Sequence, residues 1–193
     1  MSELIVILVG TIFVNNIVME RLVGVGPFVG ASRRIDAAAT MSLATLLVVT
    51  LSTTAAALVY QFVLIPLELD YLRTLSAVVV IGASIKLAQI ATRRLRPMLH
   101  EAIRTYLPLV ATNSAILGVA LLSMEEVETF FDAVIYGFGS AVGFVAVLVL
   151  MAGIRERLEA ADVPMPFRGA AIVLLTAGIM SLAFLGFAGM ARP

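Results

Sequence analysis

Two amides and two charges interrupt the first apolar stretch of the chain. Asn15 and Asn16 lie within the run VGTIFVNNIV, and Glu20 and Arg21 follow them closely. In a bilayer such side chains are costly, and they tend to face protein, water or a cofactor. One interpretation is a functional polar centre. The alternative is that the amides only hydrogen-bond neighbouring helices, while the charges extend to the cytoplasmic surface or pair with a neighbour.

A second apolar stretch, LPLVATNSAILGVAL at 107–121, carries the same kind of interruption. Both stretches also contain glycine and proline, which let a helix end. Interrupted backbone at membrane depth is tolerated only where protein or a water-filled cavity shelters it. We therefore expect a helix break in each stretch, at Gly24, Gly26 and Pro27 in the first and at Pro108 and Asn113 in the second. The expected polar centre consists of Asn15, Asn16, Asn113 and Ser114.

The composition sets the class of protein to which these stretches belong. About 61% of the residues are hydrophobic and 13% are charged, which is typical of an integral membrane protein. The net charge of +0 suggests no nucleic-acid partner. The chain has no cysteine, so disulfides, thiol chemistry and cysteine-ligated metals are excluded, and its single histidine, His100, cannot build a metal site alone. No phosphate loop or activated nucleophile is present either, so we expect no catalysis by this chain alone.

A membrane-spanning helix needs about 20 mostly apolar residues. The segments that qualify are 4–25, 38–64, 71–92, 102–123, 130–153 and 169–190. The first residues, MSELIVILVG, lack the basic leader of a signal peptide, so we expect them to begin the first span. The connections are too short to hold an extramembrane domain. The sequence therefore predicts one all-α membrane domain, 1–193, with six transmembrane helices.

Basic residues gather in alternate connections. The first, third and fifth connections hold Arg33, Arg34, Arg93, Arg94, Arg96, Arg104, Arg155, Arg157 and Arg168, whereas the fourth has only acidic charges. Basic loops stay in the cytoplasm, so we expect both termini outside it. Two three-helix halves, about 1–95 and 96–193, then have inverted orientations, and each opens with a broken helix. Broken helices at corresponding places in inverted halves mark a central site in many transporters.

Two further patterns predict contacts of this chain with neighbouring helices and with its surroundings. Gly139 and Gly143 form a small-residue motif in the fifth span, which favours close approach of a neighbouring helix. The fifth connection, IRERLEAADVPMPFRG, alternates in charge and then turns at two prolines. We interpret it as a short interfacial helix that could present a docking surface to a cytoplasmic partner.

Several stretches of the sequence carry a family resemblance. They are VNNIV, GPFVGASRR, LIPLELDYLRTL, LPLVATNSAILGVALL, YGFGSAVGF, IRERLEAADVPMPFRG and LTAGIMSLAFLGF. With them the chain resembles, from end to end, the RnfA/NqrE family. These are membrane subunits of the Rnf electron-transport complex and of the sodium-pumping NADH:quinone oxidoreductase, and the RnfA branch is the more similar.

The resemblance implies a fold, partners and a cofactor. It implies a multi-pass subunit of the bacterial inner membrane, with six spans in two inverted halves and broken first and fourth helices. It also implies a homologous, RnfE-like partner of opposite topology. In the family these two subunits together hold a [2Fe–2S] cluster on two cysteines each. Electrons pass through it between flavin and iron–sulfur subunits, coupled to Na⁺ or H⁺ movement.

The sequence departs from this family at the two cluster-ligand positions. Gly26 and Ser114 stand where the family has cysteines. Glycine offers no ligand, and serine replaces a thiolate poorly on iron. The departure fits a cluster-free paralogue, a rewired complex or an engineered ligand-free variant. Beside an electron-transfer subunit, two alternatives therefore stay open: a transporter or channel-like subunit of the same fold, and a structural assembly subunit.

Overall fold

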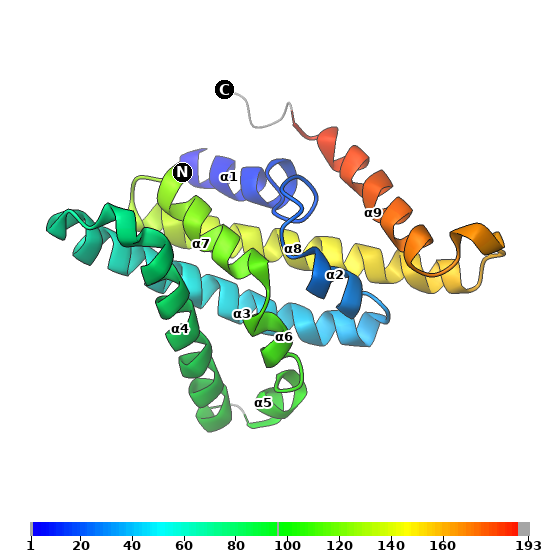
Figure 1. Cartoon of the computed structure of the whole chain (residues 1–193), viewed down its shortest axis with the longest axis horizontal. Helices are drawn as coiled ribbons and strands as arrows, with labels where there is room; N and C mark the ends of the chain where they lie inside the picture. The colour runs from blue at the N-terminus through cyan, green and yellow to red at the C-terminus, as the bar shows by residue number, and fades with distance from the viewer. Residues whose placement is uncertain (1, 96, 189–193) are drawn as a thin grey trace.

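The computed structural model describes residues 2–95 and 97–188, and every regular element within them is a helix (Figure 1). The α-helices are α1 (Ser2–Val9), α2 (Val25–Ala31), α3 (Ile35–Val59), α4 (Arg73–Leu95), α5 (Pro97–Ile103), α6 (Leu107–Ala111), α7 (Ser114–Glu126), α8 (Phe130–Glu159) and α9 (Ala170–Leu185). The short π- and 3-10 helices are η1 (Gly10–Val14), η2 (Tyr60–Leu64), η3 (Ile65–Leu67), η4 (Asp70–Leu72) and η5 (Met165–Phe167). The all-α class is confirmed. Arg96, the end of the sixth predicted span at 189–190 and the C-terminal Pro193 lie outside the described residues.

The long apolar helices support a membrane protein. Within the described ranges, three helical stretches are long and apolar enough to cross a bilayer: Ile35–Leu67, Asp70–Leu95 and Phe130–Glu159. They correspond to the second, third and fifth predicted spans. Two shorter apolar helices, Leu4–Val14 and Ala170–Leu185, lie in the first and sixth. The six-span count and the inverted halves stay predictions.

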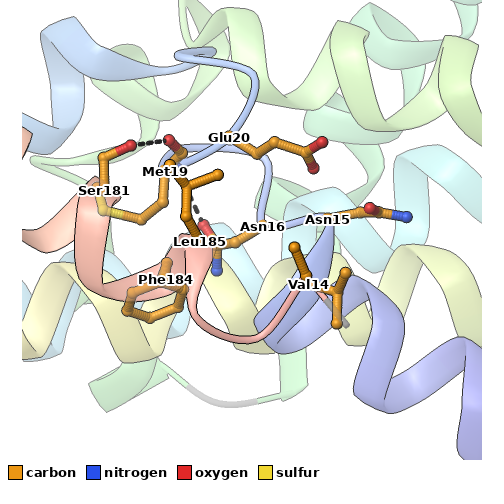
Figure 2. A pocket seen from close by; sticks show the side chains of 9 residues that line it. Val14, Asn15, Asn16, Met19, Glu20, Ser181, Phe184 and Leu185 are labelled. Atoms are coloured by element: carbon orange, nitrogen blue, oxygen red, sulfur yellow. Dashed lines mark hydrogen bonds between the residues drawn. The ribbon is translucent and has the colours of Figure 1, made fainter. Parts of the chain in front are cut away.

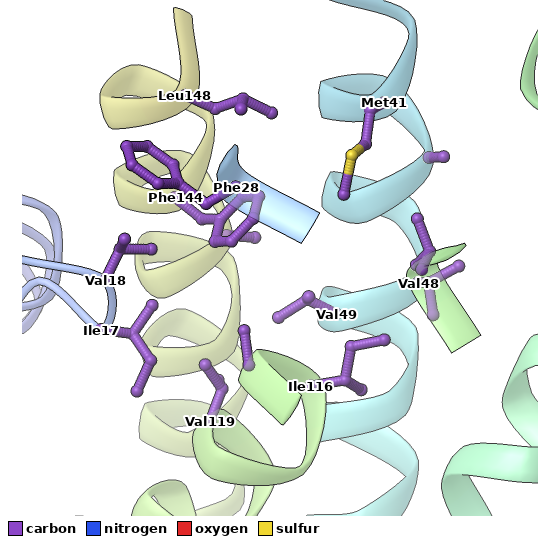
Figure 3. Close-up of a cluster of buried hydrophobic side chains, with 14 of the residues drawn as sticks. Ile17, Val18, Phe28, Met41, Val48, Val49, Ile116, Val119, Phe144 and Leu148 are labelled. Carbon is purple, nitrogen blue, oxygen red and sulfur yellow. The ribbon is translucent and has the colours of Figure 1, made fainter. Parts of the chain in front are cut away.

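Helices α3 and α8 form the centre of the molecule, running antiparallel side by side (Figure 1). Glycine lets them approach closely, since a Cβ atom at Gly137 would lie only 2.7 Å from the Cβ of Thr53. An apolar core fills the space around them, and α2 and α7 contribute to it through Phe28 and Ile116 (Figure 3). Burial of such side chains is worth about 1.5–3 kcal/mol each. This packing holds the short helices in position on the long ones.

The outward faces of the long helices are apolar as well. Helix α3 exposes Leu43, Leu47, Leu51 and Leu58, which recur at helical spacing on one side. Helix α9 likewise exposes Leu174, Leu175, Ile179 and Leu182. Exposed apolar surface of this extent is unusual for a protein in water and marks contact with lipid or with other subunits.

Three sequence-based predictions are wrong in detail. The break expected in the fourth span is present at Asn113, between α6 and α7, but Pro108 does not mark it, because Pro108 lies in the first turn of α6, where a proline fits a helix start. In the first span the break ends at Gly24, and Gly26 and Pro27 lie inside α2 rather than in the break. Helix α8 runs on to Glu159, so the charged residues expected in a separate interfacial helix belong to its last turns. Local composition marked these regions as irregular. It carries no information on which turns pack against other helices, so it could not fix where each helix begins and ends.

Candidate functional site

The first helix ends in the run of amides and is followed by irregular chain up to Gly24. The last hydrogen bond of η1 runs from the Asn15 backbone N–H to the Gly10 carbonyl, at 2.7 Å. Asn16 is fully buried, and its side chain bonds the backbone groups that follow the last helical hydrogen bond. Its Oδ1 accepts from the backbone N–H groups of Val18 and Met19, at 3.1 and 3.3 Å, and its Nδ2 donates to the Ile12 carbonyl at 2.8 Å. One amide side chain thus satisfies three backbone groups that the break sets free.

Two glycines of α8 make room for this break. A Cβ atom at Gly143 would lie 2.9 Å from Asn16 Nδ2 and 3.0 Å from the Ile12 carbonyl oxygen. One at Gly139 would collide with the hydroxyl of Thr11, which is also buried. The motif predicted to allow close helix approach therefore does so, and what it admits is the polar end of the first helix.

The second break is short and is capped by a single residue. Helix α6 ends at Ala111 and α7 begins at Ser114. Asn113 is 3% exposed, and its Oδ1 accepts from the Ala115 backbone N–H at 3.0 Å as the N-cap of α7. Its Nδ2 has no hydrogen-bond partner among the described residues.

The two breaks meet at Gly24. Its backbone N–H donates to the hydroxyl of Ser114 at 3.0 Å. Its φ of 82° lies in the left-handed region that favours glycine, and a Cβ there would be 2.8 Å from both Ala115 Cβ and Asn113 Oδ1. Gly26 follows by two residues and is exposed, as is Ser114. Segments far apart in sequence thus place Gly26 and Ser114 on adjoining elements.

The structure divides the amides expected to form one polar centre. Asn113 and Ser114 lie at the meeting point of the breaks, next to Gly24. Asn16 is buried against Gly143, and with Asn15 it lines a cavity of about 270 Å³ beside α9 (Figure 2). Asn113 lines a different cavity of about 540 Å³, between α4 and α6–α7. Each buried amide nevertheless lies beside backbone groups that a break sets free.

The sequence did not predict where the charged side chain of Arg21, in the first break, would lie. Arg21 pairs with Glu126 of the acidic fourth connection, with 3.1 Å between Nη2 and Oε1. Of the two interpretations offered for these charges, pairing is therefore correct for Arg21. The expected location near the end that holds Arg33 and Arg34 is wrong, because the irregular chain after Asn16 turns back along α7.

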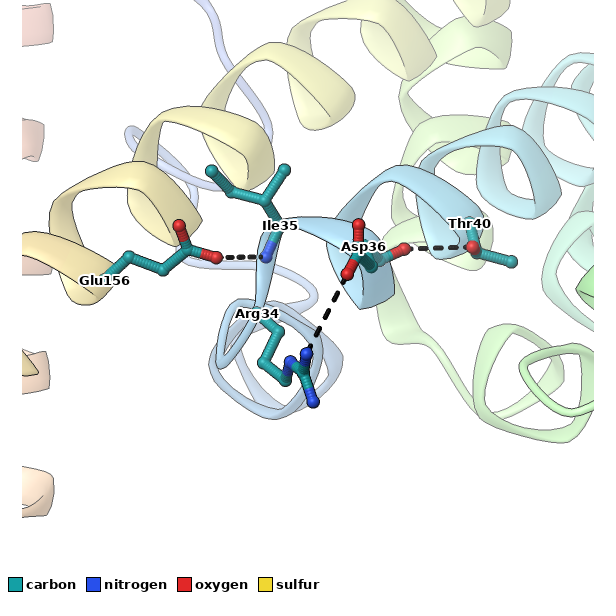
Figure 4. A network of polar contacts seen from close by, with 5 residues as sticks. All are labelled: Arg34, Ile35, Asp36, Thr40 and Glu156. Carbon is teal, nitrogen blue, oxygen red and sulfur yellow. Dashed lines mark hydrogen bonds and ion pairs between the residues drawn. The ribbon is translucent and has the colours of Figure 1, made fainter.

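A further set of contacts was missed by sequence reasoning. Arg155, near the end of α8, donates from Nη1 to the Val29 carbonyl at 2.6 Å and to the Ser32 hydroxyl at 2.9 Å. The neighbouring Glu156 accepts from the Ile35 backbone N–H at 2.9 Å, at the start of α3 (Figure 4). Together they hold the chain between α2 and α3. The only sequence signal was an adjacent pair of opposite charges at the end of an apolar helix.

Gly26 and Ser114, where the resemblance leads us to expect cluster cysteines, do not fit an iron–sulfur cluster. Gly26 has no side chain, and the hydroxyl of Ser114 accepts the Gly24 hydrogen bond. Within the described residues no group of three or more histidine, cysteine, aspartate or glutamate side chains could hold a metal ion. Of these two positions, Ser114 forms a hydrogen-bonded contact between the two breaks through Gly24, and Gly26 forms none.

Comparisons with known proteins agree in covering almost the whole chain. Residues 4–191 match the family described as Rnf-Nqr subunit, membrane protein. The chain is 49% identical over 192 residues to the RnfA subunit of the ion-translocating oxidoreductase complex of Alkalilimnicola ehrlichii, and 48% identical to those of Pseudoalteromonas translucida and Vibrio campbellii. Each alignment covers 100% of this chain and 100% of the relative.

Proposed function

Because this chain belongs to the Rnf-Nqr family of membrane subunits, we propose that it works as the RnfA subunit of an Rnf-type ion-translocating oxidoreductase complex. It forms part of the membrane core of a bacterial inner-membrane complex, with both termini outside the cytoplasm. The complex couples electron transfer, carried by flavin and iron–sulfur subunits, to the movement of Na⁺ or H⁺. The chain itself performs no catalysis.

The partner in this core is an RnfE-like homologous subunit of opposite topology. One observation carries this part of the proposal: the breaks of the two halves join through Gly24 and Ser114, and Gly26 and Ser114 beside the junction are exposed. No atom outside the glycine's own neighbourhood lies within 4 Å of a Cβ placed at Gly26. Exposed polar backbone at membrane depth needs a cover, and a homologous subunit with matching breaks supplies one.

In this complex the chain contributes no ligand to an intramembrane [2Fe–2S] cluster. Such a cluster usually takes four cysteines, or two with two histidines. His100 lies in α5, and its Nδ1 is 3.2 Å from the Thr92 hydroxyl, away from the junction of the breaks. The two cysteines expected from the partner leave one iron without protein ligands. A labile or absent cluster at this interface follows.

The Gly24–Ser114 hydrogen bond favours a second candidate as well. A junction closed by its own hydrogen bond suits a structural assembly subunit, or a cluster-free transporter or channel-like subunit of the same fold. If the chain is a structural assembly subunit, electron flow through the complex survives substitution of Asn16 and Asn113. If it is a transporter or channel-like subunit, the purified protein is a homodimer without redox partners.

Co-purification from the native membrane tests these proposals. We expect an affinity-tagged chain to bring down a homologous membrane subunit together with flavin and iron. The intramembrane cluster is assayed by iron and labile sulfide analysis and by electron paramagnetic resonance. We expect it to appear only when Gly26→Cys and Ser114→Cys are combined, with each single substitution as a control. A stoichiometric [2Fe–2S] signal at the shared interface of the unaltered complex would contradict the loss of ligands, and a homodimer alone would contradict the redox role.

A further inference from the structure

The cavity beside the first break is not explained by the contact between the two breaks. It holds about 270 Å³ and lies between the irregular chain and α9 (Figure 2). Asn15 and Glu20 line it from the break, and Ser181 and Phe184 line it from α9. The Ser181 hydroxyl donates to the Met19 carbonyl, which ties α9 to the break and fixes this wall.

The polar groups at this cavity are mainly oxygen acceptors. Helical hydrogen bonding ends with the bond from Asn15 to Gly10, and the Ile12 carbonyl accepts from Asn16, so the freed carbonyls at this cavity are those of Val14 and Asn15. The same helix end carries a partial negative charge. The side chains of Asn15 and Glu20 take part in no hydrogen bond among the described residues, and in Figure 2 both extend from the break toward the same side. A carboxylate, an amide oxygen and freed carbonyls together suit a cation.

The charges around the cavity leave one net negative charge. Arg21 is the nearest basic residue in sequence, and it is already paired with Glu126. Glu20 forms no ion pair with any described residue. A carboxylate without a basic partner beside a cavity is available to bind a cation. Glu20 is exposed, so a small ion can reach it from outside the cavity.

We propose that the cavity between the first break and α9 binds one monovalent alkali cation, with Glu20 and Asn15 as side-chain ligands and freed carbonyls of the helix end completing its shell. A single carboxylate balances a single positive charge. Divalent ions are less suitable, because Ca²⁺ takes six to eight oxygens, often from several carboxylates, and Mg²⁺ demands near-ideal octahedral geometry. Discontinuous helices in transporters coordinate cations through unwound carbonyls in the same way. The inference rests on the proposed function, since it gives the translocated ion a binding position in this chain.

Equilibrium binding of ²²Na⁺ to the purified complex in nanodiscs, with unlabelled K⁺ as competitor, tests this proposal. We expect one saturable site per chain, and at least a tenfold loss of affinity in Glu20→Gln, which keeps the shape and removes the charge. Asn15→Ala is expected to weaken binding to a smaller extent. Glu128→Gln is the matched control, because Glu128 is an exposed carboxylate that does not line this cavity. Competition by K⁺ decides which alkali ion the site prefers.

Binding that is not saturable, or that is the same in Glu20→Gln and the unaltered chain, would overturn the cation site. The same samples are scored for the homologous and redox subunits, which separates this inference from the proposed function. Redox partners retained without a Glu20-dependent site would reject only the cation site. A Glu20-dependent site on a chain that purifies without those partners would support the site and reject the proposed function.

Discussion

The two helix breaks have the same physical task and carry it out with different means. The first break is long, because no helix is present between the end of η1 at Val14 and the start of α2 at Val25. The second is short, because only Thr112 and Asn113 separate α6 from α7. The short break needs one N-cap bond, which the Ala115 N–H donates to Asn113 Oδ1. The long break needs the three bonds of Asn16 and room on α8.

The difference shows what length adds to a break in a membrane. The short gap places only two residues, Thr112 and Asn113, outside a helix. The longer gap turns back along α7, and it carries Glu20 beside a cavity and Arg21 onto Glu126. The first break is therefore the part of the molecule that can bind an ion, while the second anchors it through Ser114.

The largest expected effect is at the glycine that admits the first break. Gly143→Leu would force a side chain onto Asn16 and Ile12, so we expect a loss of about 3 kcal/mol, or failure to accumulate, since overpacking alone costs about 1–3 kcal/mol. Thermal unfolding in detergent measures it. Gly26→Ala is the control, because a Cβ there meets no atom within 4 Å. Equal stability of the two variants would contradict the role given to Gly143.

Exchanging the capping amides sharpens the comparison between the breaks. Asn16→Leu leaves several backbone groups without partners, at about 1–3 kcal/mol for each that stays buried. Asn113→Leu removes one N-cap bond, worth about 1 kcal/mol. We expect the first variant to unfold at clearly lower temperature than the second, in the same detergent. The reverse order would show that the short break, not the long one, depends more on its amide.

A smaller effect is expected where the breaks join. Ser114→Ala removes the acceptor of the Gly24 N–H, and we expect a loss of about 1 kcal/mol. Ser114→Thr keeps the hydroxyl and serves as the matched control. Thermal unfolding of both variants measures the change in stability. Proteolysis of the segment before α2 is a second measurement on the same variants. No difference between the two would mean that packing of Gly24 alone holds the junction.

The sequence predicted what depends on local composition. Runs of apolar residues located the helices now seen as α3, α4 and α8, and Asn113 marked the place where a helix stops. The first break was expected at Gly24, Gly26 and Pro27, but the helix already ends at Val14. These signals are local, because hydrogen bonding and hydrophobicity act within a turn or two.

What the sequence could not predict depends on contacts between distant segments. The pairing of Arg21 with Glu126 requires the first break to fold back along α7, and no local pattern encodes this direction. The bonds from Arg155 to Val29 and Ser32 likewise join segments that are distant in the chain. The expected grouping of Asn15, Asn16 and Asn113 did not anticipate that glycines of α8 would draw Asn16 into a separate site.

The central claim is that the two breaks meet inside the molecule, and the absence of cysteine from this chain makes that claim directly testable. A Cβ at Gly118 would lie 3.8 Å from the Cβ of Val23, within the spacing that a disulfide requires. We expect Val23→Cys combined with Gly118→Cys to form an intramolecular disulfide on mild oxidation in native membranes, seen as a shift in electrophoretic mobility. Val23→Cys with Gly178→Cys is the control, because no atom lies within 4 Å of a Cβ at Gly178. A first pair that does not cross-link, or that cross-links no better than the control, would contradict the meeting of the breaks.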